Sequence, residues 1–233
     1  GGSGWITGSY DQDLDLLYWP IGNPGPDFDR HVRLGDNLYS NSTLVLDPNN
    51  GAIKGWFQYT PNDPYDYDSI NENTFVDTQI NGKFTRATIH SNRNGYVYAH
   101  DRATGKCLWA TQFVDKLNWS GGLDKDCRPN AYDPNSDVQS YVPGTAAGRG
   151  TATEGRGTIE GVLEPGHMGG KNWPPTTYSP HTGMYYIPTI EGCNKAVTDI
   201  EVPGKFKHRQ LFLGGYPFTT FDDPNCGRIS GSI

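Results

Sequence analysis

Leu46-Asp47-Pro48-Asn49-Asn50-Gly51-Ala52-Ile53-Lys54 is the stretch of sequence that decides the fold. An apolar strand ends at an aspartate, three residues lead to a glycine, and a second strand begins directly after it. The glycine supplies the positive φ that a tight hairpin turn needs, and the aspartate side chain caps the turn by accepting a hydrogen bond. The stretch therefore predicts two antiparallel strands joined by a short turn.

The same pattern recurs farther along the chain. It appears as His100-Asp101-Arg102-Ala103-Thr104-Gly105-Lys106-Cys107-Leu108-Trp109, and in weaker form as Tyr178-Ser179-Pro180-His181-Thr182-Gly183-Met184-Tyr185. The first two copies lie 54 residues apart (101 minus 47), in the range of a propeller blade with a long loop. Radial repetition lets each short sheet bury a face on its neighbour. The repeat therefore predicts an all-β fold, specifically a β-propeller.

Other segments show the same alternation of strand and turn. Short runs next to turn signals predict strands at Leu16–Trp19, Ser42–Leu46, Tyr96–His100 and Tyr185–Pro188. No amphipathic helix of ten or more residues is predicted. The composition agrees, because 30 glycines, 17 prolines, 14 tyrosines and 6 tryptophans among 233 residues are typical of all-β proteins built from short strands.

The charge and hydropathy of the chain exclude some classes of function. The formal net charge of −7 argues against a nucleic-acid partner. The sequence has no run of 18 apolar residues, so no membrane-spanning helix is predicted. It shows no initiator methionine and no signal peptide, and both ends resemble the interior of a domain, which predicts a fragment of a longer protein.

A glycine-rich segment and the cysteines give weaker signals. Residues 144–166 are rich in small residues, and we interpret them as a long surface loop. A phosphate-binding loop is not indicated, because the Lys-Ser/Thr ending and a following helix are both missing. Four cysteines, Cys107, Cys127, Cys193 and Cys226, allow three pairings, and no CxxC pair indicates a zinc site.

The most informative acidic stretch is Thr60-Pro61-Asn62-Asp63-Pro64-Tyr65-Asp66-Tyr67-Asp68. Its prolines predict a stiff loop rather than a central strand. Asp66 and Asp68 are two residues apart, so on a flat strand both carboxylates would share one face, with Tyr67 pointing the other way. The pair could then bind one hard cation. The alternative interpretation is a solvated acidic turn.

Six motifs occur in the order Trp5-Ile6-Thr7-Gly8-Ser9-Tyr10-Asp11, Ile21-Gly22-Asn23-Pro24-Gly25-Pro26, Gly35-Asp36-Asn37, Thr60-Pro61-Asn62-Asp63, Asn92-Arg93-Asn94-Gly95 and Gly169-Gly170-Lys171-Asn172-Trp173-Pro174. Together they resemble the pyrroloquinoline quinone (PQQ)-dependent alcohol and methanol dehydrogenases, over about residues 1 to 193. The resemblance implies an eight-bladed β-propeller, of which residues 1–233 would form a partial domain of three to four blades.

The repeated hairpin phrase matches the tryptophan-docking motif that this family carries near the end of each blade. The second copy has Trp109 at the docking position. The first copy departs from the motif, because Gly55 stands where tryptophan is usual and Trp56 is next to it.

The resemblance implies a metal site. Asn23 matches the asparagine whose side-chain carbonyl binds the metal, although Asn-Pro is also a common turn former. Asp66 matches the catalytic aspartate, a general base that also lies close to the metal. Asp68 matches a position that distinguishes lanthanide-dependent members, since a trivalent ion gains more from an added carboxylate than a divalent one. A lanthanide ion is therefore implied, with calcium as the alternative.

The resemblance also implies cofactor contacts. Trp5 matches the tryptophan on which the PQQ ring stacks, and Ser3 a small polar position beside it. Arg93 matches the arginine that contacts the quinone oxygens. Asn172 matches a hydrogen-bonding asparagine, and Trp173 would wall the pocket. From the residues alone, Trp5 would be assigned to the core, Arg93 to a hairpin surface, and Asn172 with Trp173 to a structural corner.

The sequence departs from the family in several respects. Family members carry a metal-binding glutamate and a vicinal cysteine disulfide earlier in the chain, and neither is found here. Cys193 matches a cysteine whose usual partner position is occupied by Glu164, so a different partner, such as Cys226, is expected. The sequence has no Cys-x-x-Cys-His motif for a c-type haem.

The implied reaction is oxidation of a primary alcohol to an aldehyde, by hydride transfer to metal-bound PQQ, with electrons passed to a cytochrome c in the periplasm. Two alternatives are a sugar- or polyol-oxidising quinoprotein and a non-catalytic ligand-binding propeller. The combination of Asn23, Asp66, Asp68 and Arg93 favours an enzyme, because a scaffold needs no such set. The sequence fixes neither the alcohol nor the oligomeric state, for which a homodimer is one arrangement to test.

Overall fold

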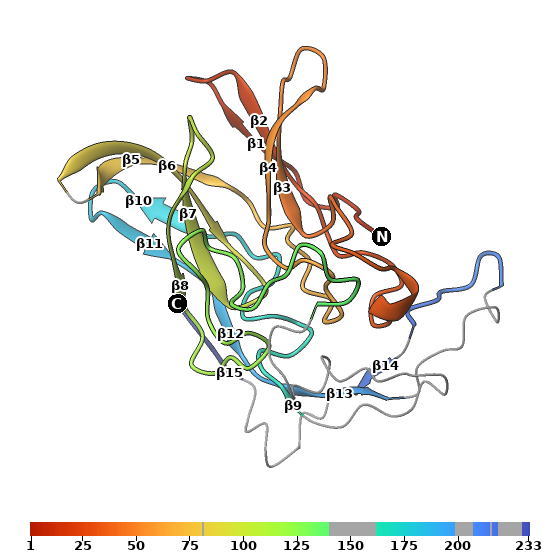
Figure 1. The fold of residues 1–233 in the computed structure, drawn as a ribbon. Helices are drawn as coiled ribbons and strands as arrows, with labels where there is room; N and C mark the ends of the chain where they lie inside the picture. The colour runs from red at the N-terminus through yellow and green to blue at the C-terminus, as the bar shows by residue number, and fades with distance from the viewer. Residues whose placement is uncertain (81, 140–161, 199–206, 215, 219–229) are drawn as a thin grey trace.

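Two four-stranded antiparallel sheets form the centre of the computed structural model, which describes residues 1–233 except 81, 140–161, 199–206, 215 and 219–229 (Figure 1). Each sheet is a meander in which consecutive strands pair. The first blade consists of β1 (Ser9–Asp11), β2 (Leu16–Pro20), β3 (Ser42–Leu46) and β4 (Ile53–Gln58). The second blade consists of β5 (Thr74–Ile80), β6 (Lys83–Ser91), β7 (Tyr96–Asp101) and β8 (Cys107–Gln112).

Smaller sheets complete the described part of the chain. They are the pair β10 (Thr177–Ser179) with β11 (Met184–Tyr186), the pair β12 (Thr189–Glu191) with β15 (Ser230–Ser232), and the set β14 (Tyr216–Phe218), β13 (Asn194–Thr198) and β9 (Val162–Leu163). Within the described residues the only helix is the three-residue 3-10 helix η1 (Arg30–Val32). The all-β prediction is therefore confirmed.

The predicted strands are found with small shifts at their ends. Ser42–Leu46 is β3 as predicted, and the predicted strand at Leu16–Trp19 becomes β2 with Pro20 added. The prediction for Tyr96–His100 extends by one residue in β7. The run Tyr185–Pro188 is only partly strand, because β11 covers Met184–Tyr186.

The three hairpin turns have the predicted geometry. Gly51, Gly105 and Gly183 have φ values of 74°, 70° and 69°. In the first turn, the Asp47 carboxylate accepts a hydrogen bond from the backbone N–H of Asn49 at 2.9 Å. In the second, Asp101 accepts bonds from the N–H groups of Ala103 and Thr104. These turns therefore close through contacts within a few residues of sequence.

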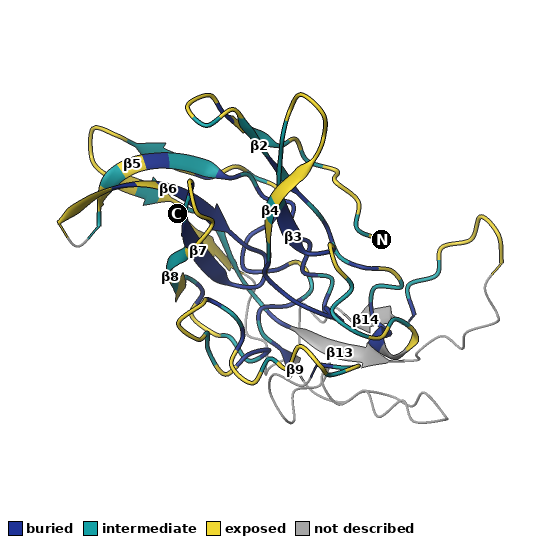
Figure 2. Ribbon diagram, turned by 45° about the horizontal axis from the view of Figure 1, so that its top comes forward, coloured by how far each residue is buried: buried dark blue, intermediate teal, exposed yellow. Residues whose placement is uncertain are grey.

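An aromatic core joins the β4–β5 connection to β7 and to the segment that follows β8. Its buried members are Tyr59, Tyr65, Tyr67, Tyr96, Tyr98, Trp119, Cys127 and Leu163. A second, aliphatic cluster on the second blade consists of Val76, Ile89, Val97 and Ala99, and side chains around β10 and β11 pack against it. Figure 2 shows β6 and β7 as largely buried strands between exposed turns.

The structure describes three of the four cysteines and only the end of the predicted loop 144–166. Cys107 of β8 is joined to Cys127 by a disulfide across a Cα–Cα distance of 6.1 Å. Cys193 is also disulfide-bonded, while its expected partner Cys226 lies outside the described residues. Most of the predicted loop 144–166 also lies outside them. Its last part is not all loop, because Val162–Leu163 pairs with β13 as β9.

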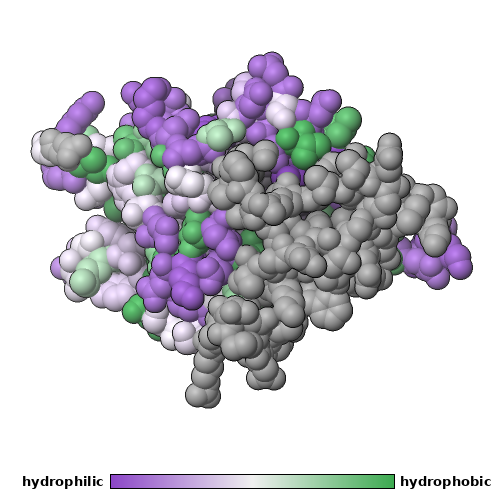
Figure 3. All heavy atoms as spheres, turned by 60° about the horizontal axis from the view of Figure 1, so that its bottom comes forward, coloured by the Kyte–Doolittle hydropathy of each residue, from purple (hydrophilic) through white to green (hydrophobic). Residues whose placement is uncertain are grey.

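The described surface is mostly polar on the face drawn in Figure 3. Hydrophilic residues cover much of it, and hydrophobic residues appear in small separate groups. No helix in the described part of the chain has the length and apolar character needed to cross a membrane.

Candidate functional site

The candidate site lies at one end of the two blades, on three connections between strands. In an antiparallel meander, successive connections alternate between the two ends of the sheet. The connections β2–β3 (21–41), β4–β5 (59–73) and β6–β7 (92–95) therefore share one end, opposite the hairpin turns at 47–51 and 101–105. Asn23, Asp66 with Asp68, and Arg93 lie on these three connections, so the topology brings the predicted set together.

Asp63 shapes the acidic loop locally. Its carboxylate accepts hydrogen bonds from the backbone N–H groups of Tyr65 (2.7 Å) and Tyr67 (2.8 Å), and from the side-chain amide of Asn41 (2.6 Å). The segment is a loop, as its prolines predict, and Asp66 adopts a left-handed φ of 64°. Tyr67 is fully buried and its hydroxyl donates to the Pro165 carbonyl, which anchors the loop on the core.

The Asp68 carboxylate accepts hydrogen bonds from three other residues of the site. Its Oδ2 accepts hydrogen bonds from Trp5 Nε1 at 3.1 Å and from Arg93 Nη1 at 3.0 Å. Its Oδ1 accepts the backbone N–H of Asn23 at 2.7 Å. The carboxylate therefore ties together residues that are 63, 25 and 45 positions away in sequence. This arrangement contradicts the alternative of a solvated acidic turn.

Gly22 makes room for Asp68. A Cβ atom at this position would lie 2.2 Å from Asp68 Oδ1 and 2.9 Å from the Ser3 carbonyl oxygen. No real Cβ contact is that short, so only glycine allows the carboxylate to reach the Asn23 N–H. The backbone N–H of Gly22 donates to the Ser3 carbonyl at 2.9 Å, which places Ser3 beside this loop through its main chain.

Arg93 lies at the tip of the β6–β7 hairpin, where a tight turn fixes its backbone. Asn92 closes this turn, because its side chain accepts the N–H of Asn94 and its carbonyl accepts the N–H of Gly95. The guanidinium of Arg93 is 3.8 Å from Asp66 Oδ2 and 3.0 Å from Asp68 Oδ2. The arginine, whose side chain is only 5% exposed, therefore bridges the two predicted carboxylates.

A second loop supports Arg93 from behind. Arg93 Nη2 donates to the carbonyl of His167, and the N–H of Gly170 donates to the Arg93 carbonyl at 2.8 Å. A Cβ at Gly169 would lie 2.6 Å from the Cβ of Arg93. The Gly-Gly pair therefore permits close backbone contact, a role that its motif alone did not reveal.

Asn172 and Trp173 belong to this supporting loop. The Asn172 side chain donates to the Met168 carbonyl (3.0 Å) and accepts the N–H of Trp173 (2.9 Å), so its amide caps the loop in this structure. Trp173 is 62% exposed, and Trp5 is 46% exposed. The assignment of Trp5 to the core from residues alone is therefore wrong, whereas Asn172 has the corner geometry that the residues alone suggested.

Asp27 is a site residue that the sequence analysis missed. Burial raises its pKa, a hydrogen bond with the Asn23 side chain opposes this, and the charge of Asp68 raises it further. The available signal was its position four residues after Asn23, on the same Pro-Gly loop. Asp27 therefore adds a third carboxylate to the neighbourhood of Asp66 and Asp68.

The crowding of carboxylates changes the acidity of Asp66. Burial raises the pKa of Asp66 to about 8, Arg93 opposes this rise, and Asp68, Asp27 and Asp63 add to it. Within the described residues, no group of three or more His, Cys, Asp or Glu side chains has the spacing of a metal site. A metal here would therefore use the Asn23 side chain beside Asp66 and Asp68, together with ligands that these residues do not supply.

Comparisons with known proteins show what the chain is similar to. Residues 1–115 match the family described as glucose/ethanol/alcohol dehydrogenase, beta-propeller domain. Quinoprotein alcohol dehydrogenase PedH of Pseudomonas putida is 39% identical over 191 residues, which cover 82% of this chain and 30% of the relative. The lanthanide-dependent methanol dehydrogenase of Methylorubrum extorquens is 35% identical over 193 residues, or 83% of this chain and 31% of the relative.

Solved structures show the same fold. A europium-containing methanol dehydrogenase superposes with a TM-score of 0.71 at 31% identity, over 94% of this chain and 33% of the other. The quinohemoprotein alcohol dehydrogenase of Comamonas testosteroni gives a TM-score of 0.78 at 29% identity, over 99% and 32%. The chain spans about a third of the length of these relatives, as a fragment of the propeller.

Proposed function

The chain belongs to the PQQ-dependent alcohol dehydrogenase family of β-propellers, and we propose that the protein oxidises a primary alcohol to an aldehyde. The observation that carries the proposal is the convergence of Asp66 and Asp68 on Arg93, with the main chain of Asn23 bonded to Asp68. These residues come from three separate connections and make no sheet or core of their own. A scaffold has no use for such a buried charge cluster, so an enzyme is favoured over a non-catalytic propeller.

The residues present fit an anionic redox ring with a hard cation. Arg93 Nε is buried and has no hydrogen-bond partner among the described residues, which leaves a buried donor for an anionic ligand. Asp66, Asp68 and Asp27 lie near one another with Arg93 as a nearby cation. Burial is the main cause of the raised pKa of Asp66, and the charges of Asp68 and Asp27 add to it. A cation bound by oxygen ligands would stabilise the charged form of these carboxylates.

The proposed roles follow from position. The Asn23 side chain, Asp66 and Asp68 hold the metal, and PQQ supplies the two-electron oxidising chemistry when it is bound. Asp66 accepts the hydroxyl proton of the alcohol, a role that a positioned carboxylate can fill as a general base. Arg93 is a buried, fixed cation that stabilises negative charge developing beside it.

The remaining cofactor contacts are proposals of the same kind. Trp5 offers an exposed indole next to Asp68, and the Ser3 carbonyl accepts a hydrogen bond from Gly22, the neighbour of Asn23. Asn172 and Trp173 follow His167 and Met168 on the loop that supports Arg93, and on this ground we assign them to the same cofactor site. For Asn172 to contact the cofactor, its side-chain amide would exchange at least one of its present loop hydrogen bonds.

A lanthanide is the proposed metal, with calcium as the alternative. Asp68 supplies the added carboxylate, and it lies beside Asp66 rather than on an unrelated surface. Stronger negative charge favours a trivalent ion over a divalent ion of similar radius. Relatives named as lanthanide-dependent methanol dehydrogenases and a europium-containing structure support this choice.

The electron acceptor, location and assembly are proposed on family grounds. We propose a cytochrome c as acceptor, the periplasm as compartment, and a homodimer as the assembly to test by light scattering. The disulfides at Cys107 and Cys193 support an oxidising compartment. A sugar- or polyol-oxidising quinoprotein remains the second candidate, because Asn23, Asp66, Asp68 and Arg93 do not distinguish one alcohol substrate from another.

One experiment tests the proposal directly. The natively purified full-length protein is analysed for metals and for the absorbance of a quinone, and is then assayed with ethanol, methanol, glucose and glycerol in the presence of lanthanum or calcium. We expect a bound lanthanide, a quinone spectrum and turnover of simple alcohols. Turnover of sugars alone would select the second candidate, and absence of both quinone and turnover after reconstitution would contradict an enzymatic role.

A further inference from the structure

The two hairpin copies differ at the position eight residues after the turn aspartate. Trp109 follows Asp101 by eight residues, and Gly55 follows Asp47 by the same interval. Each is the third residue of its strand, β8 and β4. The first blade therefore lacks a side chain at the position where the second blade has a tryptophan.

A cavity occupies the space that this difference leaves. It has a volume of about 140 Å³ and is lined by Gly55 and its neighbours on the first blade, and by β7 and its turn on the second. A Cβ built at Gly55 meets nothing closer than the Cβ of Val45 at 4.0 Å. The backbone of Gly55 therefore faces open space between the blades.

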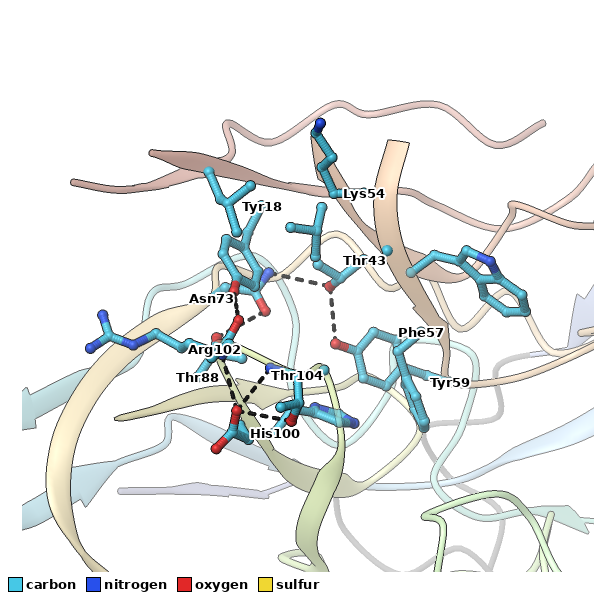
Figure 4. Close-up of a pocket in the computed structure, with 17 residues that line it drawn as sticks. Tyr18, Thr43, Lys54, Phe57, Tyr59, Asn73, Thr88, His100, Arg102 and Thr104 are labelled. Carbon is cyan, nitrogen blue, oxygen red and sulfur yellow. Dashed lines mark hydrogen bonds between the residues drawn. The ribbon is translucent and has the colours of Figure 1, made fainter. Parts of the chain in front are cut away.

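Aromatic side chains form part of the cavity wall, beside aliphatic and polar residues. Gly55, Phe57 and Tyr59 alternate along one side of the β4 segment, and Phe57 packs against the ring of His100 with 4.4 Å between centroids. Figure 4 shows Tyr18, Phe57 and Tyr59 around the space, with His100 below and Lys54 pointing away at the rim. Rings arranged in this way suit a flat aromatic guest.

The polar groups of the cavity are mostly satisfied by one another. Thr88 donates to Asn73, Asn73 donates to Thr43, and the Thr43 and Tyr59 hydroxyls bond at 2.9 Å, as the dashed lines in Figure 4 mark. His100 differs, because its buried Nε2 has no hydrogen-bond partner within the described residues. Burial lowers the pKa of His100 to about 4, so the ring is neutral and offers one donor and one acceptor.

We propose that this cavity binds a small planar aromatic molecule of indole size that carries one hydrogen-bonding group. The volume is close to that of an engineered apolar cavity of about 150 Å³ that binds benzene. The aromatic walls supply stacking and edge contacts, and His100 supplies a hydrogen-bond partner. None of the residues proposed for alcohol oxidation lines the cavity, so this site is separate from that one.

The test measures binding of 5-fluoroindole to the full-length protein by fluorine NMR. We expect saturable binding by the wild type, with chemical-shift changes at Phe57, Tyr59 and Thr104 in a protein-observed experiment. Gly55→Trp and Gly55→Phe fill the cavity and should weaken binding at least tenfold. Gly55→Ala adds one methyl group to open space and is the matched control, with affinity within about twofold of the wild type.

Three outcomes would overturn the proposal. These are no saturable binding by the wild type, shift changes confined to residues away from the cavity, and undiminished binding by a folded Gly55→Trp or Gly55→Phe variant. The first two need no variant, so the proposal stays testable even when a filled variant does not fold.

Discussion

Aspartates have different roles at the two ends of the blades. We call the end with the hairpin turns 47–51 and 101–105 the outer end, and the end with the connections 21–41, 59–73 and 92–95 the inner end. At the outer end, Asp47 and Asp101 accept hydrogen bonds from backbone groups two and three residues away in their own turns. At the inner end, Asp66 and Asp68 face Arg93, 27 (93 minus 66) and 25 residues away. The outer carboxylates thus complete local structure, whereas the inner ones join separate connections.

This contrast separates stability from function. A carboxylate that bonds its own turn is satisfied before the blades assemble, so its removal should affect local stability and leave turnover intact. A carboxylate held among other buried charges carries a desolvation cost, which Arg93 offsets in part here and a bound cation would offset further. Substitution of the inner aspartates should therefore lower turnover strongly, whereas substitution of the outer aspartates should change turnover little.

The largest expected effect is on turnover. Asp66→Asn in the full-length protein should lower kcat by about 10²- to 10⁴-fold, because the amide cannot accept the alcohol proton. Asp101→Asn is the matched control, with turnover within about twofold of the wild type. Steady-state kinetics with a saturating alcohol and metal measures both, and an active Asp66→Asn enzyme would remove Asp66 from the base role.

The next effect concerns metal choice. Asp68→Ala should lower lanthanum-supported turnover by about tenfold or more, since a trivalent ion loses a carboxylate ligand. The fold should persist, as judged by circular dichroism. Asp47→Ala makes the same chemical change at the outer end and should leave metal dependence unchanged. Equal lanthanum activity in the wild type and Asp68→Ala would defeat the assignment.

A smaller effect is expected on the pH dependence of stability. In the metal-free fold the pKa of Asp66 is raised to about 8, above an unfolded value near 4. The folded state therefore holds the proton more tightly than the unfolded chain, and the free energy of unfolding falls as pH rises between about 4 and 8. Asp66→Asn should remove this loss, so its melting temperature should exceed that of the wild type increasingly from pH 5 to pH 8.

Thermal unfolding of the metal-free protein across this pH range measures the difference. Saturating lanthanide should shrink it, because the ion stabilises the charged carboxylate in the wild type. A gap between variant and wild type that does not vary with pH would show that Asp66 is not held protonated by its surroundings.

The smallest effect belongs to the outer turn. Asp101→Ala removes hydrogen bonds to the Ala103 and Thr104 N–H groups and to the Thr104 hydroxyl, at a cost of about 1 kcal/mol. Asp101→Asn keeps a side-chain oxygen at the same place and should retain most of this stability. Urea unfolding compares the two variants, and an unchanged midpoint for Asp101→Ala would contradict the capping role.

The sequence predicted the outer end of the sheets well. The Asp-x-x-x-Gly phrase located the turns, and β3 has the predicted boundaries. It located the inner residues only through the resemblance to a family. Asp27 was missed, because its position four residues after Asn23 did not by itself show that its loop folds toward Asp68.

Local order and spacing determined the hairpins, the all-β class and the stiffness of the acidic loop, because those features depend on backbone preferences within a few residues. Tertiary structure alone decided that Asp68 bonds Trp5, Asn23 and Arg93, and that Gly55 opens a cavity between blades. Contacts between distant residues arise only when the sheets form and pack, since strand order fixes which connections share an end and packing fixes which side chains meet across the interface.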